Sequence, residues 1–349
     1  MPSVEVNGVR INYVQINCES GEDCEDLIMV HGLATNLAFW YFSHAQTFSK
    51  HYRSTLYDLR GHGRSGITYS GYTAKNMAVD LQQLLDHLGI ERAHFIAHSF
   101  GGVVALNLAC LDPDRFASLM LIDTQISAAR QLEKRIYWDM GGRIQQILDQ
   151  NGLDISVRDP YFGIRLLSAL ARLQIQGAEI SQELKDLVGH LSWKNNKRTA
   201  SQWLKLMETS QAEKELMEDD NLSLNSLKKL NFPILALYGE FSQSMLTGEK
   251  LLEALPHADF RRVRKAGHFF PIIRPSEFME NCLQFLNGTM IYGVPRRIED
   301  CSKRFFRSDR FFRREDKWFF YTRESLEMGP FEYLEEAKKF LLAKIISKS

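Results

Sequence analysis

The stretch from Phe95 to Gly102, which reads F-I-A-H-S-F-G-G, constrains the fold more than any other part of the chain. An apolar run from Ala93 to Ala97 has the character of a buried strand, and residues Val103 to Cys110 have helical periodicity. Ser99 is therefore predicted at a sharp strand-to-helix turn, where the backbone is strained and the hydroxyl is exposed. The usual pattern for such a turn has glycine two residues before the serine, where this chain has alanine. A serine that merely caps an ordinary helix is the alternative interpretation.

Length and composition limit the class of protein. The 349 residues allow one large domain, or one large and one small domain. Lysine plus arginine equals aspartate plus glutamate, 43 each, so no overall charge favours nucleic acid or an anionic membrane. The N-terminus lacks a signal-peptide pattern, and no apolar run approaches about 18 residues. We therefore expect a soluble cytoplasmic protein without a membrane span.

The cysteines agree with a reducing compartment, because they are odd in number and lack the spacing of a metal site. A disulfide between Cys18 and Cys24 stays open as an alternative. The five are Cys18, Cys24, Cys110, Cys282 and Cys301.

Strand-like apolar runs alternate with helical segments, which predicts a mostly parallel sheet covered by helices on both faces. The expected strands are Val4–Val14 (a hairpin around Asn7-Gly8), Leu27–Val30, Arg53–Asp58, Ser118–Asp123, Ile234–Gly239 and Asp259–Val263, and the expected helices are Tyr72–Leu88, Thr247–Leu255 and Ser276–Leu286. Ligands of such sheets bind at the carboxyl ends of the strands. Four polar residues follow strand ends and should share that edge: His31, Ser99, Asp123 and His268.

Residues from about 125 to 229 look helical and are predicted to form an inserted cap over this edge. Four leucines have helical spacing and are expected in the core of the cap rather than against substrate: Leu166, Leu167, Leu170 and Leu173. Trp138 and Trp203 are weak candidates for the pocket wall.

The ordered motifs H-G at His31, D-x-R-G-H-G-x-S at Asp58, A-H-S-F-G-G at Ala97 and A-G-H at Ala266 resemble the α/β-hydrolase superfamily over Val4 to Leu286. This resemblance implies the α/β-hydrolase fold and requires no cofactor or metal. It implies Ser99 as nucleophile and His268 as its base, because a serine hydroxyl needs a neighbouring imidazole to remove its proton. It also implies an oxyanion hole made by the backbone N–H groups of Leu33 and Phe100. Asp58 and Arg60 are expected to be structural, and His98 is expected to pack and hydrogen-bond.

The acid of the triad is not where most members of the family carry it. The family pattern G-x-x-D corresponds here to Gly239-Glu240-Phe241-Ser242, so Ser242 occupies the expected aspartate position. We favour Asp123, which matches an alternative placement known in some lipases and in the thioesterase domains of peptide and polyketide synthases. Glu240 is the alternative acid, and a dyad or a repurposed site is the third reading.

The predicted activity is cleavage of an ester or thioester of a mostly apolar acyl group, free or carrier-bound, through an acyl-Ser99 intermediate. The alternatives are a repurposed enzyme, such as an acyltransferase, lyase or cyclase of secondary metabolism, and a non-catalytic binding protein.

A hydrolase domain should occupy residues 1–290, with residues 291–295 as a linker and 296–349 as a small α+β appendage. Arg296 to Lys317 contains nine basic and five acidic residues. A strand is expected at Trp318–Arg323, a turn at Met328–Phe331 and a helix at Tyr333–Ile346. The segment resembles a short bacterial domain of unknown function. We expect it to mediate packing or dimerisation and not to bind nucleic acid.

Overall fold

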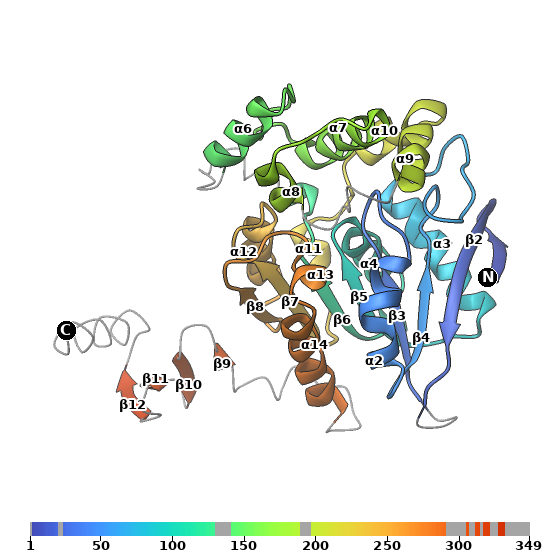
Figure 1. Ribbon diagram of the computed structural model, residues 1–349. Coiled ribbons are helices and arrows are strands. Elements are labelled where there is room, and N and C mark those ends of the chain that lie inside the picture. Colours follow the sequence, from blue (N-terminus) through green and yellow to red (C-terminus); the bar gives the residue numbers. More distant parts are fainter. Residues whose placement is uncertain are drawn as a thin grey trace.

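An eight-stranded sheet forms the centre of the computed structural model, which describes residues 2–19, 24–129, 141–188, 197–290, 305–306, 311–314, 317–321 and 327–331 (Figure 1). The strands are β1 (Ser3–Val6), β2 (Val9–Ile16), β3 (Asp26–Val30), β4 (Arg53–Tyr57), β5 (Ala93–His98), β6 (Phe116–Ile122), β7 (Ile234–Gly239) and β8 (Asp259–Val263). Their order is β1-β2-β4-β3-β5-β6-β7-β8. The pairs β1–β2 and β2–β4 are antiparallel, and every pair from β4 to β8 is parallel. The predicted mostly parallel sheet is therefore confirmed.

Helices cover both faces of the sheet, so its central strands are apolar on both sides. One face packs against α3 (Ala74–His87), α4 (Phe100–Leu111) and α12 (Met245–Ala254), and the other against α1 (Ala38–Trp40), α2 (Gln46–Phe48) and α14 (Pro275–Met290). Alternation along β5 shows the division: Phe95 and Ala97 belong to the first core, and Ile96 belongs to the second. The sequence did not predict the short helices α1, α2 and α13 (Phe270–Ile273), because helices this short leave no periodic pattern.

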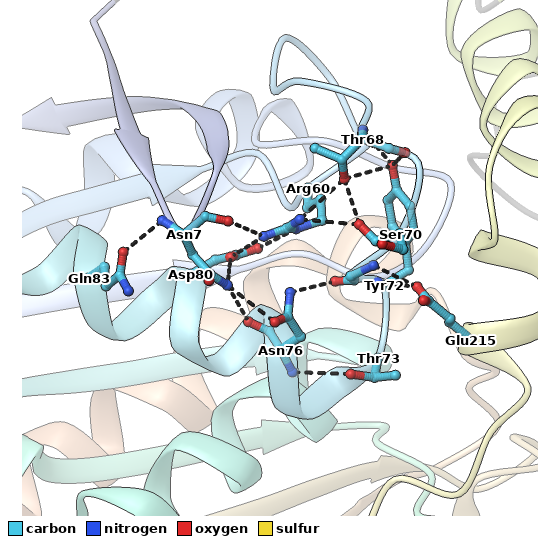
Figure 2. Close-up of polar contacts among 11 residues, drawn as sticks. Asn7, Arg60, Thr68, Ser70, Tyr72, Thr73, Asn76, Asp80, Gln83 and Glu215 are labelled. Atoms are coloured by element: carbon cyan, nitrogen blue, oxygen red, sulfur yellow. Dashed lines mark hydrogen bonds and ion pairs between the residues drawn. The ribbon is translucent and has the colours of Figure 1, made fainter.

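The predicted hairpin around Asn7-Gly8 is confirmed. Both residues have positive φ, 47° and 69°, as the tight turn between β1 and β2 requires. Asn7 also joins a polar network around Arg60, whose guanidinium donates to both carboxylate oxygens of Asp80 at 2.9 and 2.6 Å and to the Asn7 carbonyl at 2.9 Å (Figure 2). The ion pair is almost fully buried. Arg60 is thus structural, as expected, and ties the hairpin to α3.

Asp58 is likewise structural. Its carboxylate accepts hydrogen bonds from the backbone N–H groups of Leu37 and Arg64 and from the side chain of Asn12, each at 2.8 Å. These contacts hold the loop after β4 against the loop after β3.

The helical segment between β6 and β7 contains α6 (Gly141–Gln150), α7 (Phe162–Gln176), α8 (Gln182–Val188), α9 (Lys197–Thr209), α10 (Ala212–Leu216) and α11 (Leu224–Leu227). Most of this segment, from α6 to α10, lies across one end of the sheet, whereas α11 packs beside the sheet against α4 and α12 (Figure 1). The segment has its own apolar core, which includes Leu148, Leu170 and Leu184. Glu215 on α10 fastens the segment to the loop before α3, because one of its carboxylate oxygens accepts the backbone N–H groups of Gly71 and Tyr72 at 2.8 and 2.6 Å (Figure 2).

Cys18 and Cys24 form a disulfide with a Cα–Cα separation of 6.3 Å, so the pairing left open by the sequence is present. Of the other cysteines, Cys110 and Cys282 are free thiols, and Cys301 lies outside the described residues. None of the described helices combines the length and the apolar character needed to cross a bilayer.

Near the C-terminus, four short strands pair in the order β12-β11-β10-β9. They are β9 (Phe305–Phe306), β10 (Phe311–Arg314), β11 (Lys317–Tyr321) and β12 (Glu327–Phe331). The strand predicted at Trp318 is confirmed, but the turn predicted at Met328–Phe331 is wrong, because these residues belong to β12, in which Met328 and Phe331 pair with β11. An edge strand tolerates the Pro330 that suggested a turn. The helix predicted at Tyr333–Ile346 lies outside the described residues.

Candidate active site

Ser99 lies at the sharp turn between β5 and α4 with φ 55° and ψ −125°, a conformation that a non-glycine residue adopts only under strain. Strand and helix approach so closely that a Cβ on Gly101 would lie 2.4 Å from the carbonyl oxygen of His31. A Cβ on Gly32 would lie 2.9 Å from the Cβ of Ser99. Glycine is therefore required at both positions, whereas the fully buried Ala97 fits in place of the usual glycine.

Three predicted residues meet at this turn. The Nε2 atom of His268 is 3.0 Å from the Oγ of Ser99, and its Nδ1 atom is 2.5 Å from the Oδ2 of Asp123. Asp123 directly follows β6, has a positive φ of 49° and is fully buried, while the side chain of His268 is 32% exposed. A hydroxyl, an imidazole and a carboxylate in this order can move a proton away from the hydroxyl.

Ser242, which occupies the aspartate position of the family pattern, also contacts this group. Its hydroxyl hydrogen-bonds to the Oδ2 of Asp123. The backbone N–H of Gly239 donates to the other carboxylate oxygen at 2.9 Å. The aspartate that follows β6 is therefore held by groups at the end of β7 and in the turn after it.

Glu240, the alternative acid, has a different partner. Its Oε2 accepts the backbone N–H of Lys265 at 2.7 Å, which stabilises the loop before His268. The structure thus brings Asp123 and not Glu240 against the imidazole.

Two buried histidines shape the site without facing Ser99. His98 donates from Nε2 to the carbonyl of His268 at 3.0 Å and stacks on Phe39 with ring centroids 4.8 Å apart. Burial is the main cause that holds the pKa of His98 well below its ordinary value, and the neighbouring His268 ring adds to the effect, so the His98 ring is neutral. The packing and hydrogen-bonding interpretation of His98 is confirmed.

His31 accepts the backbone N–H of Leu59 at Nε2 (3.0 Å) and donates from Nδ1 to the carbonyl of Gly32 (2.7 Å). Burial lowers the pKa of His31 to about 4. The neutral ring therefore supports the loop that carries Leu33.

A cavity of about 260 Å³ opens in front of Ser99 and His268. Leu33 and Phe100, the residues predicted to supply oxyanion-hole N–H groups, both line it. Among the apolar residues in its wall are Val103, Phe162, Ile164, Leu166, Leu167 and Phe241. The acidic residues in the wall are Glu215, Glu218, Asp219 and Asp220, and no lysine or arginine of the described residues lines it.

The residues predicted for the cap divide between its core and the pocket. Leu170 is buried in the cap core and Leu173 packs against it, as expected, whereas Leu166 and Leu167 also reach the cavity. Trp203 is buried and donates its indole N–H to Ser168 at 3.1 Å, so it stabilises the cap and does not line the cavity. Trp138 lies outside the described residues.

Within the described ranges, no cluster of three or more histidine, cysteine, aspartate or glutamate side chains could hold a metal ion.

Two segments of the chain match known protein families. Residues 27–275 match the family described as alpha/beta hydrolase fold, and residues 296–344 match a domain of unknown function (DUF6316). A component of the acetoin cleaving system of Pseudomonas putida, named dihydrolipoyllysine-residue acetyltransferase, is 37% identical over 118 residues. That match covers 34% of this chain and 31% of the relative, so it spans about a third of each protein.

Two other proteins are matched over nearly their whole length. A protein of Caulobacter sp. (strain K31), provisionally named carbamate hydrolase RutD, is 26% identical over 292 residues, which cover 82% of this chain and 99% of the relative. The carboxylesterase CesB (YbfK) of Bacillus subtilis superposes with a TM-score of 0.59 at 18% identity, over 82% of this chain and 90% of that structure. At that identity the likeness to CesB shows the fold alone. Since the family match covers more than half of the chain, this protein belongs to the α/β-hydrolase family and carries a C-terminal match to a domain of unknown function.

Proposed function

We propose that this protein is a serine hydrolase that cleaves an ester or thioester bond, with Ser99 as nucleophile, His268 as general base and Asp123 as the acid. The observation that carries the proposal is the continuous series of contacts from the hydroxyl of Ser99 through both ring nitrogens of His268 to the carboxylate of Asp123. A serine hydroxyl becomes nucleophilic at neutral pH when a base is placed in this way.

In the proposed reaction the Oγ of Ser99 attacks the substrate carbonyl while its proton passes to the Nε2 of His268. Asp123 stabilises the imidazolium and fixes its orientation through Nδ1. The backbone N–H groups of Leu33 and Phe100 stabilise the oxyanion, each lowering the barrier by about 3 kcal/mol. The imidazolium then protonates the leaving alcohol or thiol. Water, deprotonated by His268, attacks the acyl-Ser99 ester and releases the acid.

The cavity wall supports a mostly apolar, electrically neutral substrate. Four carboxyl groups and no described cation line the cavity, so a phosphate-bearing carrier or a free carboxylate would be repelled rather than bound. The Caulobacter relative bears the name of a carbamate hydrolase, and a carbamate is cleaved at a carbonyl group that bears a leaving group, as proposed for this protein.

A panel of neutral esters and thioesters of increasing acyl length tests this function. We expect turnover of short apolar members, no turnover by Ser99→Ala, and little turnover when the acyl group carries a terminal carboxylate. Folded protein that hydrolyses no ester and no thioester would contradict the proposal. Product that appears only with an added alcohol or amine acceptor would instead identify an acyltransferase, which forms the same acyl-Ser99.

We further propose that residues 1–290 act as the catalytic unit, with the cap at about 125–229 and residues 291–295 as the linker to an appendage at 296–349. Protein lacking residues 291–349 should keep the esterase activity and lose any self-association, and loss of activity would contradict this division. Cytoplasmic location stays a prediction, and the Cys18–Cys24 disulfide argues against it, because such bonds persist mainly in oxidising compartments.

A further inference from the structure

Ser242 has a hydroxyl whose hydrogen-bonding direction is fixed by its surroundings. The side chain is buried, and its oxygen accepts the backbone N–H of Ser244 at 3.1 Å. The same oxygen lies in hydrogen-bonding contact with the Oδ2 of Asp123. An ionised carboxylate only accepts hydrogen bonds, so the hydroxyl proton is directed at Asp123.

Asp123 depends on donors from outside its own strand. Its side chain is fully buried, and a buried carboxylate must be hydrogen-bonded to stay ionised. Gly239 supplies an N–H to Oδ1 at 2.9 Å, whereas Ser242 and His268 both approach Oδ2. The turn after β7 is itself held by a hydrogen bond from the Ser242 N–H to the Gly239 carbonyl at 3.0 Å. The donors therefore form one rigid unit that fixes the carboxylate plane.

We propose that Ser242 is a positioning residue for Asp123: its hydroxyl holds the carboxylate in the plane that faces His268 and shares the oxygen to which the imidazole donates. This inference rests on the proposed function and concerns the same site. It assigns a use to the residue that stands at the aspartate position of the family pattern G-x-x-D.

Sharing of Oδ2 has a consequence for the pH dependence of the reaction. The hydrogen bond from Ser242 partly neutralises the negative charge on this oxygen. The oxygen therefore stabilises the imidazolium of His268 less strongly than it would without the hydroxyl. Without the hydroxyl, the imidazolium is stabilised more strongly, and a higher pH is needed to free the base. The carboxylate is also less firmly oriented, which slows the chemical step.

The other titratable groups around His268 do not supply this effect. His98 lies on β5, and its ring centroid is 4.7 Å from that of His268. It is neutral because burial keeps its pKa well below the ordinary value. The carboxyl groups of the cavity wall, on α10 and the residues after it, are unchanged by a substitution at Ser242; they are Glu215, Glu218, Asp219 and Asp220.

Four variants test the proposal: Ser242→Ala, Ser242→Thr, Ser118→Ala and Ser99→Ala. Ser118 is a matched control, because it is also a buried serine, and its hydroxyl hydrogen-bonds to His94 at 2.7 Å. It lies near the start of β6, at the opposite end of that strand from Asp123. For Ser242→Ala we expect kcat to fall about tenfold, the loss of one hydrogen bond to a charged group, with KM nearly unchanged. The acid limb of kcat/KM should move to higher pH by about half a unit.

Ser242→Thr should keep most of the wild-type rate, and Ser118→Ala should leave the acid limb in place even if it lowers the melting temperature. An unmoved acid limb in folded Ser242→Ala protein, or the same shift in Ser118→Ala, would overturn the positioning role. If Ser99→Ala also retains activity, the proposed function itself fails. Loss of activity in Ser99→Ala together with wild-type behaviour of Ser242→Ala would overturn this inference alone.

Discussion

Asp123 lies 145 residues before His268 in the chain, yet its Oδ2 atom is 2.5 Å from the Nδ1 of the imidazole. The register of the sheet explains how Asp123 also comes beside the serine. His98 on β5 pairs with Ile122 on β6, so the residues that follow them, Ser99 and Asp123, leave the sheet side by side. Both have positive φ, which turns their side chains out of the strand direction and toward the imidazole between them.

Replacement of Asp123 by asparagine tests which carboxylate orients the base. Asp123→Asn should lower kcat on the order of 10⁴-fold, because the amide favours the wrong tautomer of His268 and cannot stabilise its charged form. Glu240→Gln is the matched control and should stay within about twofold, since Glu240 accepts the N–H of Lys265 and, within the described part of the chain, makes no hydrogen bond or ion pair with His268. Steady-state kinetics at equal melting temperature decide the question. The reverse order of the two losses would show that Glu240 is the acid.

Glu215 is predicted to control how firmly the cap closes over the cavity. Glu215→Ala removes two hydrogen bonds from backbone N–H groups to a carboxylate, at a cost of about 1–3 kcal/mol in the free energy of unfolding. Because Glu215 also lines the cavity, we expect KM to rise by about five- to tenfold and kcat to change less. Glu213→Ala on the same helix, where the side chain is exposed, should change neither quantity. A fall in kcat at constant KM would contradict a role in cap closure.

Removal of Arg60 should leave the buried carboxylate of Asp80 unpaired. Arg60→Ala is expected to lower the free energy of unfolding by about 3–5 kcal/mol at neutral pH. Burial raises the pKa of Asp80, partly opposed by Arg60, so protonation of this carboxyl favours the folded state. The deficit of the variant should therefore shrink as the pH falls from neutral toward the ordinary value of 3.8.

Urea unfolding at several pH values measures this dependence. Lys250→Ala, which breaks a surface ion pair with Glu253, should cost less than about 1 kcal/mol at any pH. A deficit in Arg60→Ala that is independent of pH would show that the lost packing, and not the unpaired charge, destabilises the variant.

The sequence predicted the sheet and the ends of its strands because buried parallel strands are short apolar runs with turn residues on either side. The strand at Asp259–Val263 has the predicted bounds. Ser99 and Asp123 directly follow strands, and His268 lies in the loop after β8, as expected. Contacts between distant loops could not be predicted in this way. The choice between Asp123 and Glu240 depends on the direction of each side chain: Asp123 faces His268, whereas Glu240 accepts the backbone N–H of Lys265.

Ser242 and Glu215 were missed as contributors for the same reason. Each is a common polar residue in a loop or helix, and its importance arises from one partner far away in the sequence: Asp123 for Ser242, and the Gly71-Tyr72 backbone for Glu215. For Ser242 the available signal was its place at the aspartate position of the family pattern G-x-x-D, which indicated the position but not the contact with Asp123.

Covalent labelling of Ser99 tests the central claim most directly. A fluorophosphonate probe reacts with a serine only when a neighbouring base activates the hydroxyl. We expect mass spectrometry of the digested protein to place the phosphonyl group on the peptide that contains Ser99, with slower labelling in His268→Ala and none in Ser99→Ala. Absence of labelling at Ser99 in protein with a native unfolding transition, or labelling that persists at the same rate in His268→Ala, would contradict the account.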